Sequence, residues 1–90
     1  MIRDYIAVDV ETTGLNPARD RLLEIGAARI LNGKVEETYQ TFIDAGVEVP
    51  ERITELTGIT DEMRLSGKRP EQAIPEFLEF WGELPILGHN

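Results

Sequence analysis

The 90-residue sequence contains no cysteine, which excludes disulfide bonds and metal sites built from thiolates. It also lacks any apolar run near the ~20 residues that a membrane-spanning helix needs, and its N-terminus lacks the charged-then-apolar pattern of a signal peptide. These absences are typical of a cytoplasmic protein that has no membrane partner. A chain of this length predicts at most one small domain with a modest core.

Basic residues are scarce, because 9 lysines and arginines stand against 17 acidic residues, for a formal net charge of −8. Residues 1–34 hold five acids and five bases, whereas residues 35–90 hold twelve acids and four bases and carry the whole excess. This balance argues against a protein that coats duplex nucleic acid through a broad basic face. It is neutral towards a metal-dependent site in the first third of the sequence.

The sequence does have a short, largely apolar segment, residues 5–10, with two carboxylates at its end, Asp9 and Glu11. It predicts a buried strand, and residues 12–17 predict the turn that ends it. Because side chains alternate along a strand, Asp9 and Glu11 should project from the same face, about 7 Å apart along the backbone. Two like charges this close repel each other, and a divalent cation would relieve the repulsion. Taken alone, such a pair at a strand end is more typical of a solvated turn.

Two more strands follow the turn. Residues 22–31 form a largely apolar strand that runs into Asn32-Gly33, the dipeptide most typical of a type I′ hairpin. Residues 35–43 alternate between apolar and polar side chains, which predicts a half-exposed strand towards a sheet edge. The second and third strands should therefore pair antiparallel.

Helices are predicted in the second half of the sequence. A short helix starts at or just after Pro50 and stops at Gly58, and another starts at a Thr60 cap. The longest helix opens at Pro70, and Pro75 within it should bend it or delay its start. Its apolar stripe, expected to pack on the sheet, consists of Ile74, Phe77, Leu78 and Trp81.

A fourth strand begins near residue 85. A strand that follows a crossover helix normally lies parallel to the first strand, so we expect an α/β fold with a mixed sheet. This pairing would bring His89 and Asn90 close to Asp9 and Glu11. Apolar residues on both faces of the first strand also predict that it is covered on both sides.

The segment Asp9-Val-Glu-Thr-Thr-Gly-Leu15 resembles, without gaps, the first motif of the 3′–5′ exonucleases of the DEDD superfamily, in particular the proofreading epsilon-subunit-like (DnaQ-like) group of DNA polymerase III. Leu56-Thr-Gly-Ile-Thr60 is similar to the connecting helices of that family, and Leu87-Gly-His-Asn90 to the start of its second motif. The resemblance extends over the whole chain. It implies a ribonuclease-H-like fold truncated after the fourth strand, with residues 1–90 as the N-terminal part of a single exonuclease domain.

The resemblance also implies a chemistry, the hydrolysis of a terminal phosphodiester with two bound Mg²⁺ or Mn²⁺ ions. Asp9 would bridge both ions, and Glu11 would hold the ion that carries the attacking water. Asn90 would touch the substrate backbone. The partners implied are a single-stranded DNA 3′ end, the mononucleotide product and a replicative polymerase. The pocket for the terminal nucleotide would be lined by Thr12, Thr13, Gly14 and Leu15.

The sequence departs from the family in what it does not contain. The second-motif aspartate, the third-motif histidine or tyrosine base and the last aspartate have no counterpart within the 90 residues, and His89 belongs by its order to the second motif. We therefore expect little or no nuclease activity from these 90 residues alone. Glu24 would either support the metal ligands or face solvent. Two other interpretations stay open: an RNA-trimming exonuclease of the same superfamily, and a non-catalytic half-domain that binds or self-associates through its incomplete sheet.

Overall fold

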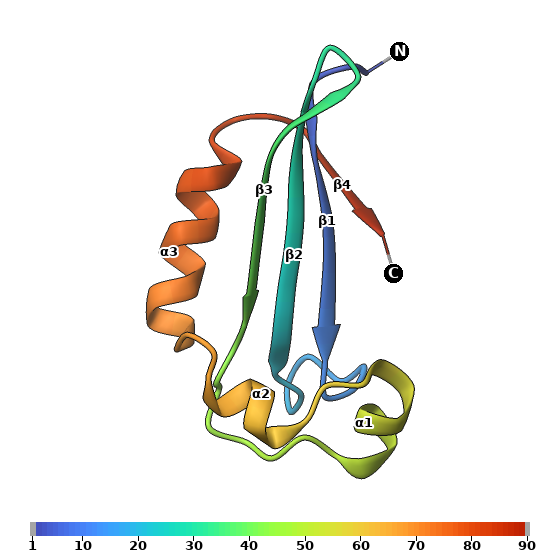
Figure 1. Cartoon of the computed structure of the whole chain (residues 1–90), viewed down its shortest axis with the longest axis vertical. Helices are drawn as coiled ribbons and strands as arrows, with labels where there is room; N and C mark the ends of the chain where they lie inside the picture. Colours follow the sequence, from blue (N-terminus) through green and yellow to red (C-terminus); the bar gives the residue numbers. More distant parts are fainter. Residues whose placement is uncertain (1, 90) are drawn as a thin grey trace.

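The computed structural model describes residues 2–89, which form one four-stranded sheet and three helices (Figure 1). Every predicted strand and helix is present, in the predicted order. No helix in this described part of the chain is both long and apolar enough to cross a membrane. The elements are β1 (Tyr5–Thr12), β2 (Leu22–Leu31), β3 (Lys34–Phe42), α1 (Glu51–Thr57), α2 (Asp61–Leu65), α3 (Pro70–Trp81) and β4 (Ile86–His89).

The strands lie in the order β3-β2-β1-β4. The hairpin prediction is confirmed, since β2 and β3 pair antiparallel and both Asn32 (φ 53°) and Gly33 (φ 76°) have the positive φ that a type I′ turn requires. The prediction for the last strand is also confirmed, since β4 pairs parallel with β1 and places the His89 backbone opposite Asp9. The sheet is therefore mixed, with β1 in its interior.

α3 covers one face of the sheet, on the left side of the view in Figure 1. Its predicted stripe is wrong in part, because Ile74 and Leu78 are exposed. Ala73 and Phe80 are buried instead, and Phe77 is half-buried against Tyr39 of β3. The stripe that faces the sheet is thus rotated towards Ala73, whose small side chain lets the helix backbone approach the strands.

Of the two predicted effects of Pro75 on α3, the late start does not occur, and the bend stays a prediction. The helix begins at Pro70, so the expected late start at Pro75 is wrong. Pro75 is exposed, and its ring lies on the solvent side of a helix that continues to Trp81. There the Trp81 indole N–H donates to the Leu84 carbonyl oxygen at 2.6 Å, which fixes the turn that leads into β4.

The opposite face of the sheet differs from the prediction that β1 is covered on both sides. Within residues 2–89, no helix packs over Ala7 and Asp9, and Asp9 is exposed. Their register partners Ala28 and Gly26 carry little or no side chain, so the surface here is a shallow hollow of about 240 Å³. In the described part of the chain, Asp9, one of the two carboxylates predicted to bind metal, is therefore not covered by a helix.

α1 and α2 close the end of the sheet where β1 stops and β2 starts (Figure 1). Leu23 at the start of β2 is fully buried beneath them, together with Ile53 of α1 and Ile59 of the connection. Burying one such side chain contributes roughly 1.5–3 kcal/mol. Gly58 has the left-handed conformation (φ 82°) that ends α1, and the Thr60 hydroxyl accepts the Met63 N–H, as the capping prediction required.

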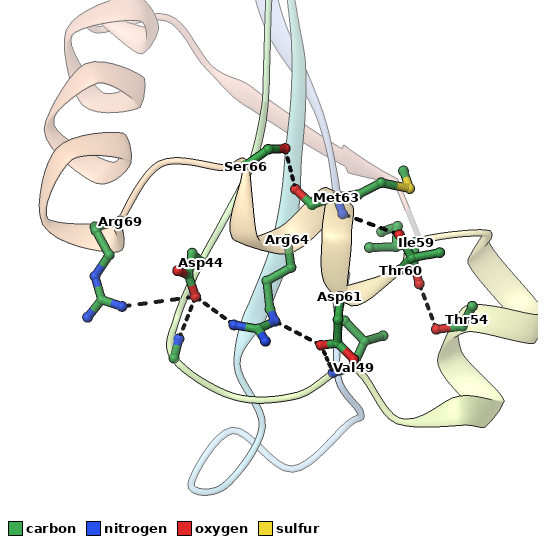
Figure 2. Close-up of polar contacts among 11 residues, drawn as sticks. Asp44, Val49, Thr54, Ile59, Thr60, Asp61, Met63, Arg64, Ser66 and Arg69 are labelled. Carbon is green, nitrogen blue, oxygen red and sulfur yellow. Dashed lines mark hydrogen bonds and ion pairs between the residues drawn. The ribbon is translucent and has the colours of Figure 1, made fainter.

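A buried arginine fastens α2 to the segment that follows β3 (Figure 2). Arg64 is only 7% exposed, and its guanidinium donates to Asp44 at 2.7 Å and to Asp61 at 3.0 Å. The same two carboxylates also accept backbone N–H groups, Asp44 from Gly46 and Asp61 from Val49. The two carboxylates therefore balance the charge of Arg64, as a buried ion requires. Through their hydrogen bonds they also join α2 to the segment between β3 and α1.

This network predicts a loss of stability in acid. The Gly46 N–H, followed by the Arg64 guanidinium, holds the pKa of Asp44 below its ordinary value of 3.8. The unfolded chain then binds a proton that the folded chain does not, so this stabilisation is present above the ordinary pKa and is lost as the pH falls through the lower folded-state pKa. Urea unfolding midpoints should thus fall as the pH is lowered through and below 3.8.

Asp44→Asn should flatten this pH dependence, whereas Glu55→Gln, which removes the same charge from the exposed face of α1, should leave it unchanged. A wild-type slope in Asp44→Asn would show that the acid sensitivity arises elsewhere.

Candidate functional site

The two carboxylates lie near the carboxyl end of β1. Asp9 pairs with Gly26 of β2 and with the backbone of His89 on β4, and Glu11 pairs with Glu24 of β2. Asp9 is exposed and Glu11 is half-buried. The strand runs on to Thr12, further than predicted, so both acids belong to regular strand and their shared face follows from its alternation.

Residues 13–21 form a loop whose two ends are joined by hydrogen bonds. The Thr13 N–H donates to the Arg21 carbonyl oxygen at 2.9 Å, and the Arg21 N–H donates to the Thr13 hydroxyl at 3.0 Å. The Thr13 hydroxyl in turn donates to Asp20 at 2.9 Å, and the Asn16 N–H donates to the other oxygen of that carboxylate at 2.8 Å. Asp20 thus joins the two halves of the loop.

The position of Asp20 explains two features of this loop. The Asn16 N–H and then the Thr13 hydroxyl lower the pKa of Asp20 from its ordinary value, so the carboxylate stays charged while it accepts both bonds. A Cβ on Gly14 would lie 2.5 Å from an Asp20 oxygen, so only glycine lets the loop close this tightly. The Thr12 hydroxyl donates to the Gly14 carbonyl oxygen at 2.6 Å and fixes the first step of the turn.

The loop and α1 enclose a hollow of about 1070 Å³ beside the two carboxylates. Two leucines on its wall have little cover, since Leu15 is 100% exposed and Leu56 of α1 is 81% exposed. Large exposed apolar side chains beside charged groups at a hollow are typical of a ligand-binding site.

Five of the predicted site residues meet at this hollow. Asp9, Glu11 and Leu15 line it, and so do Thr12 and Gly14. Thr13 does not, because it is 5% exposed and its hydroxyl is used within the loop, so the structure gives it a role in shaping the pocket rather than in lining it.

The last predicted site residue, Asn90, lies outside the described residues, so its predicted contact with substrate stays a prediction.

The donor set fits a hard divalent cation only in part. Carboxylate oxygens are the ligands that Mg²⁺ and Mn²⁺ prefer, and Asp9 and Glu11 offer them from one face of a strand. Among the side chains that the structure describes, those of residues 2–88, no group of three or more aspartates or glutamates could hold an ion. Glu24, the nearest further carboxylate by register, accepts from Gln40 on β3 at 2.8 Å and is held on the side away from β1. This contact favours the surface interpretation of Glu24.

The hollow also contains residues that the sequence patterns did not identify. Arg52, Ile53 and Leu56 of α1 reach it, as does Asp20 at the end of the loop. The sequence pointed to α1 only through its resemblance to the connecting helices of the family, and that resemblance does not say where the helix lies in the fold. The position of α1 is set by its packing on Leu23, which is distant in the sequence.

Comparison with known proteins gives a consistent result. The family model RNase_T, described as an exonuclease, matches residues 6–90. A DNA polymerase III of PolC type from Clostridium perfringens is 37% identical over 87 residues, and one from Thermotoga petrophila is 41% identical over 86. The DNA polymerase III subunit epsilon of Aquifex aeolicus is 35% identical over 85 residues. The aligned parts cover 97%, 96% and 94% of this chain, but only 6%, 6% and 42% of these relatives.

Solved structures share the fold. The chain superposes on E. coli exonuclease I in complex with a 5cy-dA13 oligonucleotide with a TM-score of 0.78 and 24% identity, over 99% of this chain and 21% of that one. The nuclease domain of 3′hExo, a DEDDh family member bound to rAMP, gives a TM-score of 0.76 and 16% identity, over 96% of this chain and 50% of that one.

Proposed function

The chain belongs to the RNase_T exonuclease family, and from this membership we propose that residues 1–90 are the N-terminal part of a single metal-dependent 3′–5′ exonuclease domain that acts on DNA. Its α/β fold, a mixed sheet with helices packed on it, is the ribonuclease-H-like fold of exonucleases in the matched region. The observation that carries the proposal is geometric: the Asp9–Leu15 motif ends β1 at the hollow, with both acids on one face.

The choice of DNA over RNA comes from the relatives. Those at 35–41% identity are named as DNA polymerase III of PolC type or as its epsilon subunit. The structure bound to rAMP is only 16% identical and supports the fold alone. On this basis we propose a proofreading type of activity and a replicative polymerase as partner, with an RNA-trimming exonuclease as the alternative.

Each residue of the site has a role in this proposal. Asp9 and Glu11 would hold Mg²⁺ or Mn²⁺, which when bound activates water and stabilises the leaving oxygen. Gly14 lets the loop close against Asp20 because it has no side chain, and it lines the part of the hollow proposed for the terminal nucleotide. Leu15 presents a fully exposed apolar surface to the terminal base, and Thr13 with Asp20 keeps both in place. The products are a mononucleotide and a strand one residue shorter.

The test uses the polypeptide that the reading frame containing these residues encodes, incubated with 5′-labelled single-stranded DNA and Mg²⁺. A ladder that shortens by one nucleotide at a time from the 3′ end supports the proposal. Label released as a mononucleotide, or fragments cut internally, would contradict it. The same assay on single-stranded RNA decides between DNA and the RNA-trimming alternative.

The 90-residue polypeptide by itself is expected to show little or no hydrolysis in this assay. Asp9 and Glu11 are two of the four carboxylates that the family motifs call for, and the side chains of residues 2–88 offer no group of three that could hold a metal ion. The prediction would be contradicted if the purified 90-mer digested DNA in a metal-dependent way and Asp9→Ala abolished this activity.

A second candidate function is binding or assembly without catalysis. It is favoured by β4, which lies at the sheet edge and leaves Ile86 and Leu87 exposed. Sedimentation of the 90-mer distinguishes the candidates, because pairing through this edge predicts a dimer at micromolar concentration and a catalytic fragment does not require one.

A further inference from the structure

The hollow is lined by positively charged groups as well as by carboxylates. Arg21 and Arg52 both line it, together with Asp9 and Glu11. The guanidinium of Arg21 is already engaged, since it donates to the carbonyl oxygens of Arg19 and Asp20 at 2.9 and 3.2 Å. Arg52 is exposed on α1, and within residues 2–89 its guanidinium makes no hydrogen bond or ion pair.

Arg52 differs in this respect from the other arginines. Elsewhere arginines are tied to carboxylates or carbonyl oxygens, as Arg64 is to Asp44 and Asp61. The charge of Arg52 helps to lower the pKa of Asp20, but the two oxygens of Asp20 already accept from Thr13 and Asn16. The charge of Arg52 is therefore available to a ligand in the hollow, and a guanidinium is suited to bind phosphate oxygens in pairs.

We propose that Arg52 binds a backbone phosphate of the single strand whose 3′-terminal nucleotide occupies the hollow, so that the site prefers an oligonucleotide to a free nucleotide. The inference rests on the proposed function, because it takes the carboxylate side of the hollow as the place of the terminal nucleotide. The hollow, at about 1070 Å³, lies at the upper end of the roughly 300–1,000 Å³ typical of small-ligand sites, so it has room for the terminal nucleotide. The net charge of −8 argues against a broad basic face, but a single arginine–phosphate contact does not need one.

The experiment titrates the ¹⁵N-labelled chain, with Mg²⁺ present, with the trinucleotide dT3 and with its methylphosphonate-linked analogue, which has no backbone charge. Arg52→Ala is compared with Lys34→Ala, which removes the same charge at the hairpin end of β3, far from α1 in Figure 1. Arg52→Ala should weaken dT3 binding about three- to fivefold. It should also reduce the slope of log affinity against log salt by about 0.7, the contribution of one single-strand phosphate contact.

The two possible failures are distinguishable. Binding of the analogue should be the same in wild type and Arg52→Ala, and Lys34→Ala should bind dT3 as wild type does. If Arg52→Ala and Lys34→Ala bind dT3 alike while the amides of Gly14 and Leu15 still shift, the role of Arg52 is overturned and the proposed pocket stands. If neither ligand shifts those amides, the pocket itself, and with it the role of Arg52, is overturned.

Discussion

Asp9→Asn is expected to lower 3′–5′ hydrolysis by roughly 10³-fold or more in the polypeptide that the reading frame encodes. Bound metal would supply several kcal/mol of transition-state stabilisation, and Asp9 is one of its two proposed ligands in this chain. Asparagine keeps the size of the side chain and one oxygen but loses the charge. The measurement is the rate of shortening of 5′-labelled single-stranded DNA with Mg²⁺.

Glu24→Gln is the matched control for this substitution. It removes one charge from the same face of the sheet, at the register partner of Glu11, but from a side chain that Gln40 holds towards β3. We expect a rate within about threefold of wild type, which corresponds to less than 1 kcal/mol. Equal losses in both variants would mean that the charge of the face matters rather than Asp9 as a ligand.

The 90-residue chain offers a second measurement on the same residue. Mn²⁺ should broaden the amide signals of Asp9 and Glu11 at lower concentration than those of exposed acids elsewhere, because two carboxylates on one face attract a divalent ion. Asp9→Asn should remove this preference. Broadening that is uniform over all acidic residues in wild type would argue against a metal site at this strand end.

Gly67→Ala is expected to destabilise the fold by about 3 kcal/mol, at the upper end of overpacking costs. A Cβ at Gly67 would lie 2.9 Å from the Ile43 nitrogen and closer still to the Phe42 carbonyl group. That carbonyl oxygen accepts the Lys68 N–H at 3.0 Å, so the backbone cannot move away without breaking the bridge that holds α2 and α3 to the end of β3. Urea unfolding with far-UV circular dichroism measures the loss.

Gly88→Ala is the control for this second substitution. A Cβ at Gly88 meets nothing within 4 Å, so the change should stay within about 0.5 kcal/mol of wild type. If Gly67→Ala were as stable as Gly88→Ala, the contact between residue 67 and the end of β3 would have to be looser than the structure has it.

Local rules account for most of the secondary structure and for part of the topology. Asn32-Gly33 specifies the β2–β3 turn because few other residue pairs adopt two consecutive positive φ angles. The helix between residue 70 and residue 81 imposes a crossover, and the handedness and layering of such connections make β4 parallel to β1. Both outcomes depend on chemistry within a few residues or on a general rule of chain geometry.

Which residues of α3 face the sheet cannot be predicted from the sequence of the helix alone. Ile74 and Leu78 form an apolar row as good as that of Ala73, Phe77 and Phe80, so periodicity alone cannot choose between them. The choice is made by Tyr39 on β3, whose ring lies 5.8 Å from that of Phe80 and whose hydroxyl donates to Glu76. Contacts across 37 or more residues cannot be read from a local pattern.

Some residues of the candidate site can likewise be predicted from local sequence, and others cannot. Asp9, Glu11 and the Thr12–Leu15 turn are contiguous, so alternation and a matching motif are sufficient to find them. Asp20, Arg52 and Leu56 reach the hollow only through the fold of the loop and the packing of α1 on Leu23. Charge and exposure identify them once they are placed, and not before.

The closed base of the 13–21 loop has a thermodynamic consequence. A loop that is mobile before binding must lose conformational entropy when a ligand orders it, and that loss subtracts from affinity. Here the bonds of Asp20 to Thr13 and Asn16 form when the chain folds. The entropic cost of ordering this loop is therefore met when the chain folds, so that the proposed contact of a nucleotide with Leu15 can contribute to affinity nearly in full.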